Sequence, residues 1–514
     1  MDIYNSVSAL VQYGLATGLI KPEDSTYTLN SIYAYLNIEG KDQTGDVYPS
    51  DIDSQQAYLL QLQSILDDII HWAFETGRLP SKSADFADLF DSGLMNCLMG
   101  RPSEVIQTFN TLKGVHPAKA TDYLYHMGIY SNYIRMSRIQ KNLMWQATTD
   151  FGPMDITINL SKPEKDSKAI AAAAHAQVDS ASKDYPKCLL CVENEGYKGR
   201  LDHPARQNLR LMPLTLNQEK WMLQYSPYAY YSEHCIVLSA EHVPMKLTEA
   251  TFARLLDFVD AFPHYFVGSN ADLPIVGGSI LTHDHFQGGQ FEFAMTKAES
   301  EKTYSLQGYE DLNVSRVKWP MSVLRITGTS KSRVVEAAGV VFRAWQNYSD
   351  AAVGVLSHSG DELHNTVTPI ARRRGDAFEL DIVLRNNRTD EHYPDGIFHP
   401  HRDIHHIKRE NIGLIEVMGL AVLPGRLSQE LDELANVLSK QKNWSEVSES
   451  LALHEAWYLQ LSDVHGMGMS KAQAWDILKK EVGHKFMQAL EHAGVFKRTP
   501  RGLEAFDQFV NGIS

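Results

Sequence analysis

The spacing of apolar residues changes along the chain, from a helical period in the first third to short strand-like runs in the middle. The segment "SQQAYLLQLQSILDDIIHWAFETG" carries apolar residues at intervals of three and four, which predicts an amphipathic helix: Leu59, Leu62, Ile65, Leu66, Ile69 and Ile70. The Ala-rich segment "KPEKDSKAIAAAAHAQVDSASKD" predicts a further helix and a polar link. We therefore expect a helical N-terminal region over residues 1–184.

Strand-like runs dominate residues 185–425, among them "WMLQY", "HCIVLS", "VLRITG" and "FELDIVLR". One helix interrupts them after Thr248, where Phe252, Leu255, Leu256 and Val259 follow a helical spacing. A strand–helix–strand order occurs over about 222–293 and again over about 320–390. We expect two related halves, residues 185–310 and 311–425, followed by a helical C-terminal region over residues 426–514.

Composition narrows the class of protein. The 514 residues are 43% apolar and 22% charged, as in ordinary globular proteins, and the net charge of −15 argues against a nucleic-acid partner. The sequence contains no apolar run of the ~18–20 residues that span a bilayer, and "MDIYNSVSAL" lacks the layout of a signal peptide. We expect a cytoplasmic protein with no membrane partner.

Four cysteines in this length are too few for a disulfide framework: Cys97, Cys188, Cys191 and Cys235. The Cys-x-x-Cys pair, Cys188 and Cys191, fits half of a metal site, a redox pair or two core residues.

The stretch "GGSILTHDHFQGG" contains the residues that point most clearly to a catalytic site. If it forms a β-strand, one face carries Ser279, Leu281, His283, His285 and Gln287. The two histidines would then lie roughly 6.5–7 Å apart, which is too far for both to act on one atom. Glycines on both sides leave backbone N–H groups open to a phosphate. These features indicate a phosphate site in which the two histidines have different roles.

A neutral imidazole can attack phosphorus through one ring nitrogen while the other donates a hydrogen bond that fixes the tautomer. The amide of Gln287 can donate to phosphoryl oxygens but supplies no titrating proton. A phosphate ester, with a second pKa of about 6, leaves without a general acid, whereas an alcohol needs one. Glutamine therefore favours transfer between phosphates, and a third histidine would favour hydrolysis.

The longer segment "DLPIVGGSILTHDHFQGG" closely resembles the signature of the class II galactose-1-phosphate uridylyltransferases, a branch of the histidine-triad superfamily with a helical N-terminal extension. The resemblance extends over the chain and implies an α+β fold with a histidine-triad-like antiparallel sheet core. It implies a ping-pong transfer of a uridylyl group from UDP-glucose to galactose 1-phosphate, and a homodimer. It also implies that His285 is the nucleophile, Gln287 the phosphoryl-binding amide, and Asn270 and Ser279 the diphosphate contacts.

The resemblance further implies a structural zinc ion, held by Cys188, Cys191, His242 and His283. Two thiolates and two imidazoles form a closed tetrahedral set, which is typical of structural rather than catalytic zinc. Two cysteines that are merely buried, with His242 at a strand end, are the alternative.

A second histidine cluster occurs in "FHPHRDIHHIKRENIGLIEVMG", with His399, His401, His405 and His406. The resemblance implies that Glu416, which follows it, contacts the hexose. The spacing of these histidines does not match the second metal site of class I relatives, so a second metal stays open. Likewise, "ARRRGD" at Arg372–Arg374 fits either a phosphate contact or a solvated turn.

Other functions compete with the transferase. A histidine-triad-type nucleotide hydrolase or phosphorylase is the nearest alternative, and Gln287 argues against it. A zinc hydrolase would need an open ligand position that four protein ligands do not leave. A binding module would not explain the placement of His285.

Overall fold

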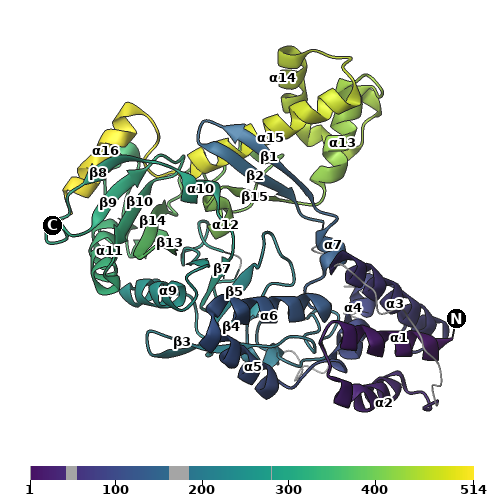
Figure 1. The fold of residues 1–514 in the computed structure, drawn as a ribbon. Helices are drawn as coiled ribbons and strands as arrows, with labels where there is room; N and C mark the ends of the chain where they lie inside the picture. The colour runs from purple at the N-terminus through teal and green to yellow at the C-terminus, as the bar shows by residue number, and fades with distance from the viewer. Residues whose placement is uncertain (1, 42–54, 161–184, 279, 514) are drawn as a thin grey trace.

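The computed structural model describes residues 2–41, 55–160, 185–278 and 280–513. Helices fill the N-terminal region, as predicted, and gather at one end of the molecule (Figure 1). The amphipathic pattern predicted from Leu59 onward forms the longest of them, α3, whereas the predicted Ala-rich helix lies outside the described residues. These helices are α1 (Ile3–Ala16), α2 (Ser25–Leu36), α3 (Gln55–Glu75), α4 (Ala84–Asn96), α5 (Pro102–Val115), α6 (Pro117–Tyr130) and α7 (Met136–Ile139).

The N-terminal region also contains a hairpin that the apolar spacing did not reveal. Strands β1 (Leu143–Thr149) and β2 (Gly152–Ile158) pair antiparallel, and β15 (Leu420–Leu423) adds to β2 in parallel. This small sheet joins segments that are far apart in sequence. Local spacing cannot predict it, because the second partner of β2, the strand β15, is distant in the sequence.

A ten-stranded antiparallel sheet forms the centre of the molecule, which confirms the predicted sheet core. Five strands from each half meet at β6 and β13, and the order of the first half, 3-4-5-7-6, is mirrored by 8-9-10-14-13. Both halves therefore share one connectivity, with a long helix between their third and fourth strands, as expected for related halves. In spatial order the strands are β3 (Met212–Leu216), β4 (Glu219–Tyr225), β5 (Cys235–Ser239), β7 (His285–Gly289), β6 (Phe266–Gly268), β13 (Asn365–Arg374), β14 (Ala377–Asn386), β10 (Val323–Gly328), β9 (Asn313–Val317) and β8 (Ser300–Tyr304).

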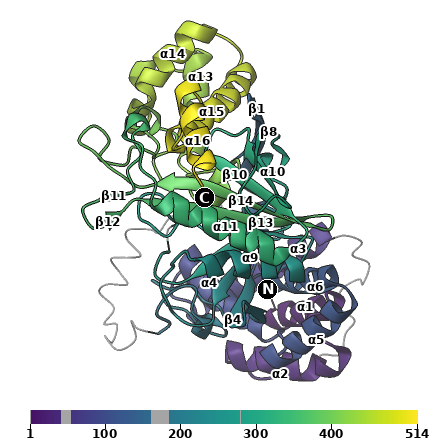
Figure 2. The same ribbon diagram turned by 90° about the vertical axis from the view of Figure 1, so that its left-hand side faces the viewer.

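Helices α9 (Glu249–Ala261) and α11 (Lys331–Gln346) pack against each other and cover one face of this sheet (Figure 2). The helix predicted after Thr248 is α9, and its N-terminus has a capping box in which Thr248 N–H donates to the side-chain oxygen of Thr251. The apolar stripe of α9 packs into a core that also includes Phe286 of β7, whose ring stacks on Trp221 at 4.7 Å. Because side chains alternate along a strand, the neighbours of Phe286 on β7 face away from the helices.

The opposite face of the second half is covered by a second apolar cluster, to which the small sheet and the C-terminal helices contribute. As predicted, the chain is helical after the sheet, and α15 packs against both α13 and β1. Phe506 and Phe509 of α16 return to the first cluster, around Trp345. The helices are α13 (Leu427–Leu438), α14 (Glu455–His465), α15 (Lys471–Ala493) and α16 (Pro500–Asn511).

Short elements complete the described chain. They are α10 (Ala294–Lys297), α12 (Leu414–Val417), the hairpin of β11 (His358–Ser359) and β12 (Glu362–Leu363), and the 3-10 turns Pro22–Asp24, Val192–Asn194, Ala351–Val353, Arg402–Ile404, Trp444–Glu446 and Glu449–His454. Among the helices in the described ranges, none has the length and apolar content that crossing a bilayer requires.

Candidate active site and metal centre

The two histidines of the His-x-His-x-Gln stretch do not lie on one strand, contrary to our expectation. Strand β7 begins only at His285, and the preceding residues bend. Backbone hydrogen bonds hold the bend against the neighbouring loop, from Asp284 N–H to the Val243 carbonyl (2.7 Å) and from Ser239 N–H to the Asp284 carbonyl (2.9 Å). The bond from Ser239 continues the register of β5 and β7 by one residue, whereas Asp284 N–H leaves that ladder for Val243, so the regular pairing ends before His283.

His285 is held as a neutral ring with one nitrogen available. The side chain is 5% exposed, and burial lowers its pKa to about 4. Its Nδ1–H donates to the backbone carbonyl of His283 at 2.8 Å. A neutral imidazole carries one proton, so Nε2 keeps its lone pair, and no group in the described residues hydrogen-bonds to it. The ring therefore has the tautomer of a nucleophile.

Gln287 lies two residues further along β7, on the same face as His285. Its amide oxygen is 3.2 Å from Nε2 of His234, a buried histidine directly before β5. Sequence analysis did not single out His234. The register of β5 and β7 explains the contact: Ile236 pairs with Gln287, and His234 lies diagonally across from it.

Asn270 and Glu416 are far apart in sequence, and the structure brings both to the start of α12. The Asn270 side-chain oxygen accepts a hydrogen bond from Leu414 N–H at 2.8 Å, and a Glu416 carboxylate oxygen accepts one from Gly413 N–H at 2.8 Å. Glu416 also forms a buried ion pair with Lys408, a residue that sequence analysis missed. Asn270 and Glu416 therefore stabilise the same turn.

The loop before the histidines also contacts Asn270. A Cβ added to Gly278 would lie 2.7 Å from the Asn270 amide nitrogen, so only glycine fits there. The predicted contact Ser279 lies outside the described residues.

The structure brings together the four predicted metal ligands: Cys188, Cys191, His242 and His283. Their ligand atoms all lie within 4.8 Å of one another. Cys188 Sγ is 3.5 Å from Cys191 Sγ and 3.3 Å from His283 Nδ1, and Cys191 Sγ is 3.1 Å from His242 Nδ1. In a tetrahedral zinc site, with bonds of about 2.3 Å to sulfur and 2.0–2.1 Å to nitrogen, ligand atoms are roughly 3.3–3.8 Å apart. The observed spacing is close to that of such a site.

The groups around these residues also suit a metal. His283 Nε2–H donates to the Ser239 carbonyl at 2.9 Å, which directs the Nδ1 lone pair toward the thiols. Asn194 donates from its amide to the carbonyls of Cys188 and Cys191, at 2.8 Å each, and so fixes the Cys-x-x-Cys turn. Burial raises the pKa of Cys188, but its hydrogen bonds outweigh burial and lower that pKa, whereas burial raises the pKa of Cys191 to about 11, so Cys188 is the thiol that ionises more readily.

The second histidine cluster is arranged differently. His401, Asp403 and His492 lie close enough for one ion, but the rings of His401 and His492 stack at 4.0 Å, only 17° from parallel. Parallel stacked rings direct their lone pairs side by side rather than to one centre, so this geometry does not suit a metal. His399 instead hydrogen-bonds Asn411 at 3.2 Å.

The second half of the sheet has buried ion pairs on the face that, in the first half, carries His285 and Gln287. Asp381 is fully buried between Arg325 (2.7 Å) and Arg372 (2.6 Å), and Glu379 also pairs with Arg372 (2.6 Å). Burial raises the pKa of Asp381, but the two arginines outweigh it and lower the pKa below its usual range. Arg372 is therefore occupied in the core and does not face a phosphate.

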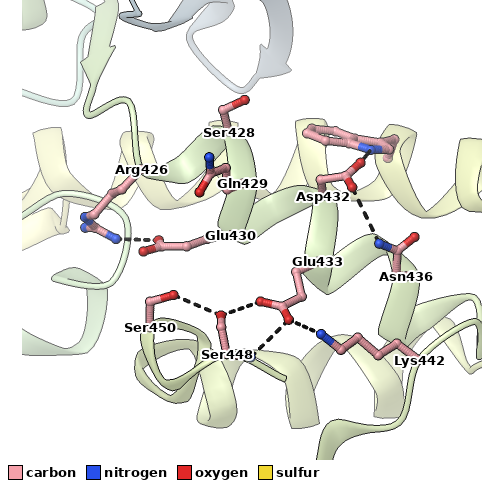
Figure 3. Close-up of a pocket in the computed structure, with 11 residues that line it drawn as sticks. Arg426, Ser428, Gln429, Glu430, Asp432, Glu433, Asn436, Lys442, Ser448 and Ser450 are labelled. Atoms are coloured by element: carbon pink, nitrogen blue, oxygen red, sulfur yellow. Dashed lines mark hydrogen bonds and ion pairs between the residues drawn. The ribbon is translucent and has the colours of Figure 1, made fainter. Parts of the chain in front are cut away.

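A polar cavity of about 810 Å³ lies in the C-terminal region, between α13 and the segments around Ser448 and Trp475. Figure 3 shows side chains that line it. Many of its polar side chains bond to one another: Arg426 pairs with Glu430, and Glu433 with Lys442 and Ser448. None of residues 270–287 lines it, so this cavity is not the site formed around His285.

Comparisons with known proteins identify the family of this chain. Two family models match, "Galactose-1-phosphate uridyl transferase, N-terminal domain" over residues 43–244 and "Galactose-1-phosphate uridyl transferase, C-terminal domain" over residues 258–465. The galactose-1-phosphate uridylyltransferase of Clostridium acetobutylicum is 52% identical over 99% of both chains. Those of Halalkalibacterium halodurans and Bacillus subtilis are 51% and 49% identical, over 99% and 100% of this chain and 98% of each relative. This chain belongs to the galactose-1-phosphate uridylyltransferase family.

Proposed function

We propose that this protein transfers a uridylyl group from UDP-glucose to galactose 1-phosphate, giving UDP-galactose and glucose 1-phosphate, through a covalent intermediate on His285. The observation that carries the proposal is the ring of His285, whose Nδ1–H is bound to the His283 carbonyl at 2.8 Å while Nε2 has no hydrogen bond to any described residue. The names of the relatives support the choice of substrates.

In the first half-reaction, the Nε2 lone pair of His285 attacks the α-phosphorus of UDP-glucose. The bond from that phosphorus to the bridging oxygen breaks, and glucose 1-phosphate leaves with the electron pair. Because this leaving group is a phosphate with a pKa of about 6, it needs no proton from the enzyme. The ring becomes cationic as the bond to phosphorus forms, and the His283 carbonyl at Nδ1–H stabilises that charge.

In the second half-reaction, a phosphate oxygen of galactose 1-phosphate attacks the same phosphorus, and the bond to Nε2 breaks. UDP-galactose leaves, and His285 regains its lone pair. The amide of Gln287 would donate to the phosphoryl oxygens in both transition states, where negative charge is concentrated.

We assign supporting roles to the remaining predicted residues. Asn270 and Ser279 would contact the diphosphate, and Glu416 would accept hydrogen bonds from hexose hydroxyls. Asn270 and Glu416 meet at one turn, which supports a shared site for the two ends of a sugar nucleotide.

A zinc ion would be held by Cys188, Cys191, His242 and His283. With four protein ligands it would stabilise structure and fix His283, whose carbonyl orients His285. The family resemblance also supports a homodimer, which sedimentation equilibrium of the purified protein would test: a mass of one chain would contradict it.

Intact-protein mass spectrometry tests the covalent step. Incubation with UDP-glucose alone should add the mass of one uridylyl group, galactose 1-phosphate should remove it, and His285→Asn should show no adduct. Release of UMP into water without an adduct would instead support the histidine-triad-type hydrolase. A rate law requiring both substrates bound together would also contradict the ping-pong scheme.

A further inference from the structure

The contact between His234 and Gln287 joins a buried histidine to the amide that would face the transferred phosphoryl group. His234 is 3% exposed, and its Nε2 lies 3.2 Å from the Gln287 amide oxygen. The rings of Tyr230 and Tyr231 lie on the His234 ring, with centroids at 5.4 and 4.7 Å, and limit its rotation. The side chain of His234 is thus held in one orientation against Gln287.

The tautomer of His234 follows from its surroundings. Burial lowers its pKa to about 4, so the ring is neutral near pH 7 and carries a single N–H. A backbone interaction with Tyr228 acts in the opposite direction and raises the pKa, but it does not reach the distance and angle of a hydrogen bond, so Nδ1 has no hydrogen-bond partner among the described residues. The proton therefore belongs on Nε2, where the Gln287 amide oxygen accepts it.

This hydrogen bond decides which end of the amide faces the substrate. An amide that can rotate freely presents its oxygen and its NH₂ group about equally, and the oxygen repels an anionic phosphoryl group. With the oxygen held by His234, the NH₂ group points away from that ring. No described residue accepts a hydrogen bond from it, so both of its protons are free for the substrate.

We propose that His234 is a positioning residue for uridylyl transfer, which holds the Gln287 amide with its oxygen inward and its NH₂ group toward the phosphoryl oxygens. This inference rests on the proposed function, because it assumes a phosphoryl group beside Gln287. His234 acts only through Gln287 and does not itself contact the substrate.

A double-mutant cycle tests the proposal. His234→Leu removes the donor at similar volume, and it should lower kcat about tenfold or more with KM within about twofold, because the amide mainly stabilises the transition state. In a protein that already carries Gln287→Ala, His234→Leu should lower kcat by less than about a further twofold, because the amide that His234 orients is absent. His234→Gln, whose amide nitrogen reaches the position of Nε2, should recover most of the activity.

His364→Leu is the matched control. His364 is a buried histidine, 4% exposed, whose Nδ1 lies 2.9 Å from the side-chain oxygen of Asn387, so it has a similar amide contact in the second half. We expect this variant to lose thermal stability much as His234→Leu does, and its effect on kcat to add to that of Gln287→Ala.

Additive losses in the His234–Gln287 cycle, with normal uridylylation of the wild type, would overturn the positioning role and leave the proposed function intact. Absence of the wild-type adduct would refute the function itself. If His234→Leu does not fold, ¹⁵N-histidine NMR of the wild type decides: a proton on Nε2 of His234 supports the proposal, and one on Nδ1 contradicts it.

Discussion

The Nδ1–H of His285 donates to the backbone carbonyl of His283 at 2.8 Å, while the side chain of His283 turns to the cysteine pair. One residue therefore connects the proposed metal centre to the proposed nucleophile. The His283 carbonyl holds the proton of the His285 ring on Nδ1 and sets the direction of that ring.

The zinc site should prove structural. We expect about one zinc ion per chain in the purified protein, and Cys188→Ser should lose it, lower the thermal midpoint and slow uridylylation, because His283 loses its anchor. Elemental analysis and thermal unfolding measure these effects. Cys97→Ser, at the end of α4, is the control and should keep the metal. A zinc-free wild-type protein with full activity would contradict this prediction.

Gln287 should act in the transition state. Loss of one donor to a developing oxyanion lowers kcat by about 10²–10³, and we expect this for Gln287→Ala with little change in KM. Gln287→Glu should be slower still, since it places a carboxylate beside the phosphoryl oxygens. Single-turnover formation of the uridylyl adduct gives the rate directly. An effect confined to KM would show that the amide only binds the ground state.

The buried ion pairs of the second half should make a large contribution to stability. Asp381→Ala leaves the buried guanidinium groups of Arg325 and Arg372 with only the carboxylate of Glu379 between them, so the free energy of unfolding should fall by about 3–5 kcal/mol. Urea denaturation measures this change. Asp311→Ala breaks an exposed pair with Arg333, which water screens, and should leave the free energy of unfolding almost unchanged. Equal effects of the two variants would contradict this account.

Acid should destabilise the protein partly through His234. Its pKa is lowered from 6.5 to about 4 in the folded state, so between these values the unfolded chain takes up a proton that the folded chain does not. Stability therefore falls as the pH falls through this window. At pH 5 the loss from this one residue amounts to about 2 kcal/mol. In His234→Gln, the decrease in unfolding free energy from pH 7 to pH 5 should be smaller by about that amount, and an unchanged decrease would argue against the shift.

Much of the fold could be predicted because periodicity is a local property. The helical spacing from Leu59 and the capped stripe after Thr248 form α3 and α9, and the strand-like runs form β4, β5, β10 and β14. Each pattern places the apolar residues of a segment on one face. Burying that face stabilises the helix or strand, whichever elements of the fold pack against it.

The type of reaction at the candidate site could be predicted from the sequence, but the positions of its side chains could not. Two histidines and a glutamine between glycines indicated phosphoryl transfer, yet the strand expected through His283 bends before His285. The bend depends on hydrogen bonds to the loop around Val243, which no local pattern encodes. The contact of His234 with Gln287 likewise depends on the register of two strands separated by α9.

By itself, then, the sequence determined the elements, their buried faces and the chemical groups available for a phosphoryl transfer. Only the tertiary structure decided that β15 joins β2, that Asn270 meets Glu416 at one turn, and which end of the Gln287 amide is held. The physical reason is that these pairings depend on strand register and on packing between segments that are distant in the sequence. Secondary-structure propensity and periodicity, in contrast, depend only on residues close together in one segment.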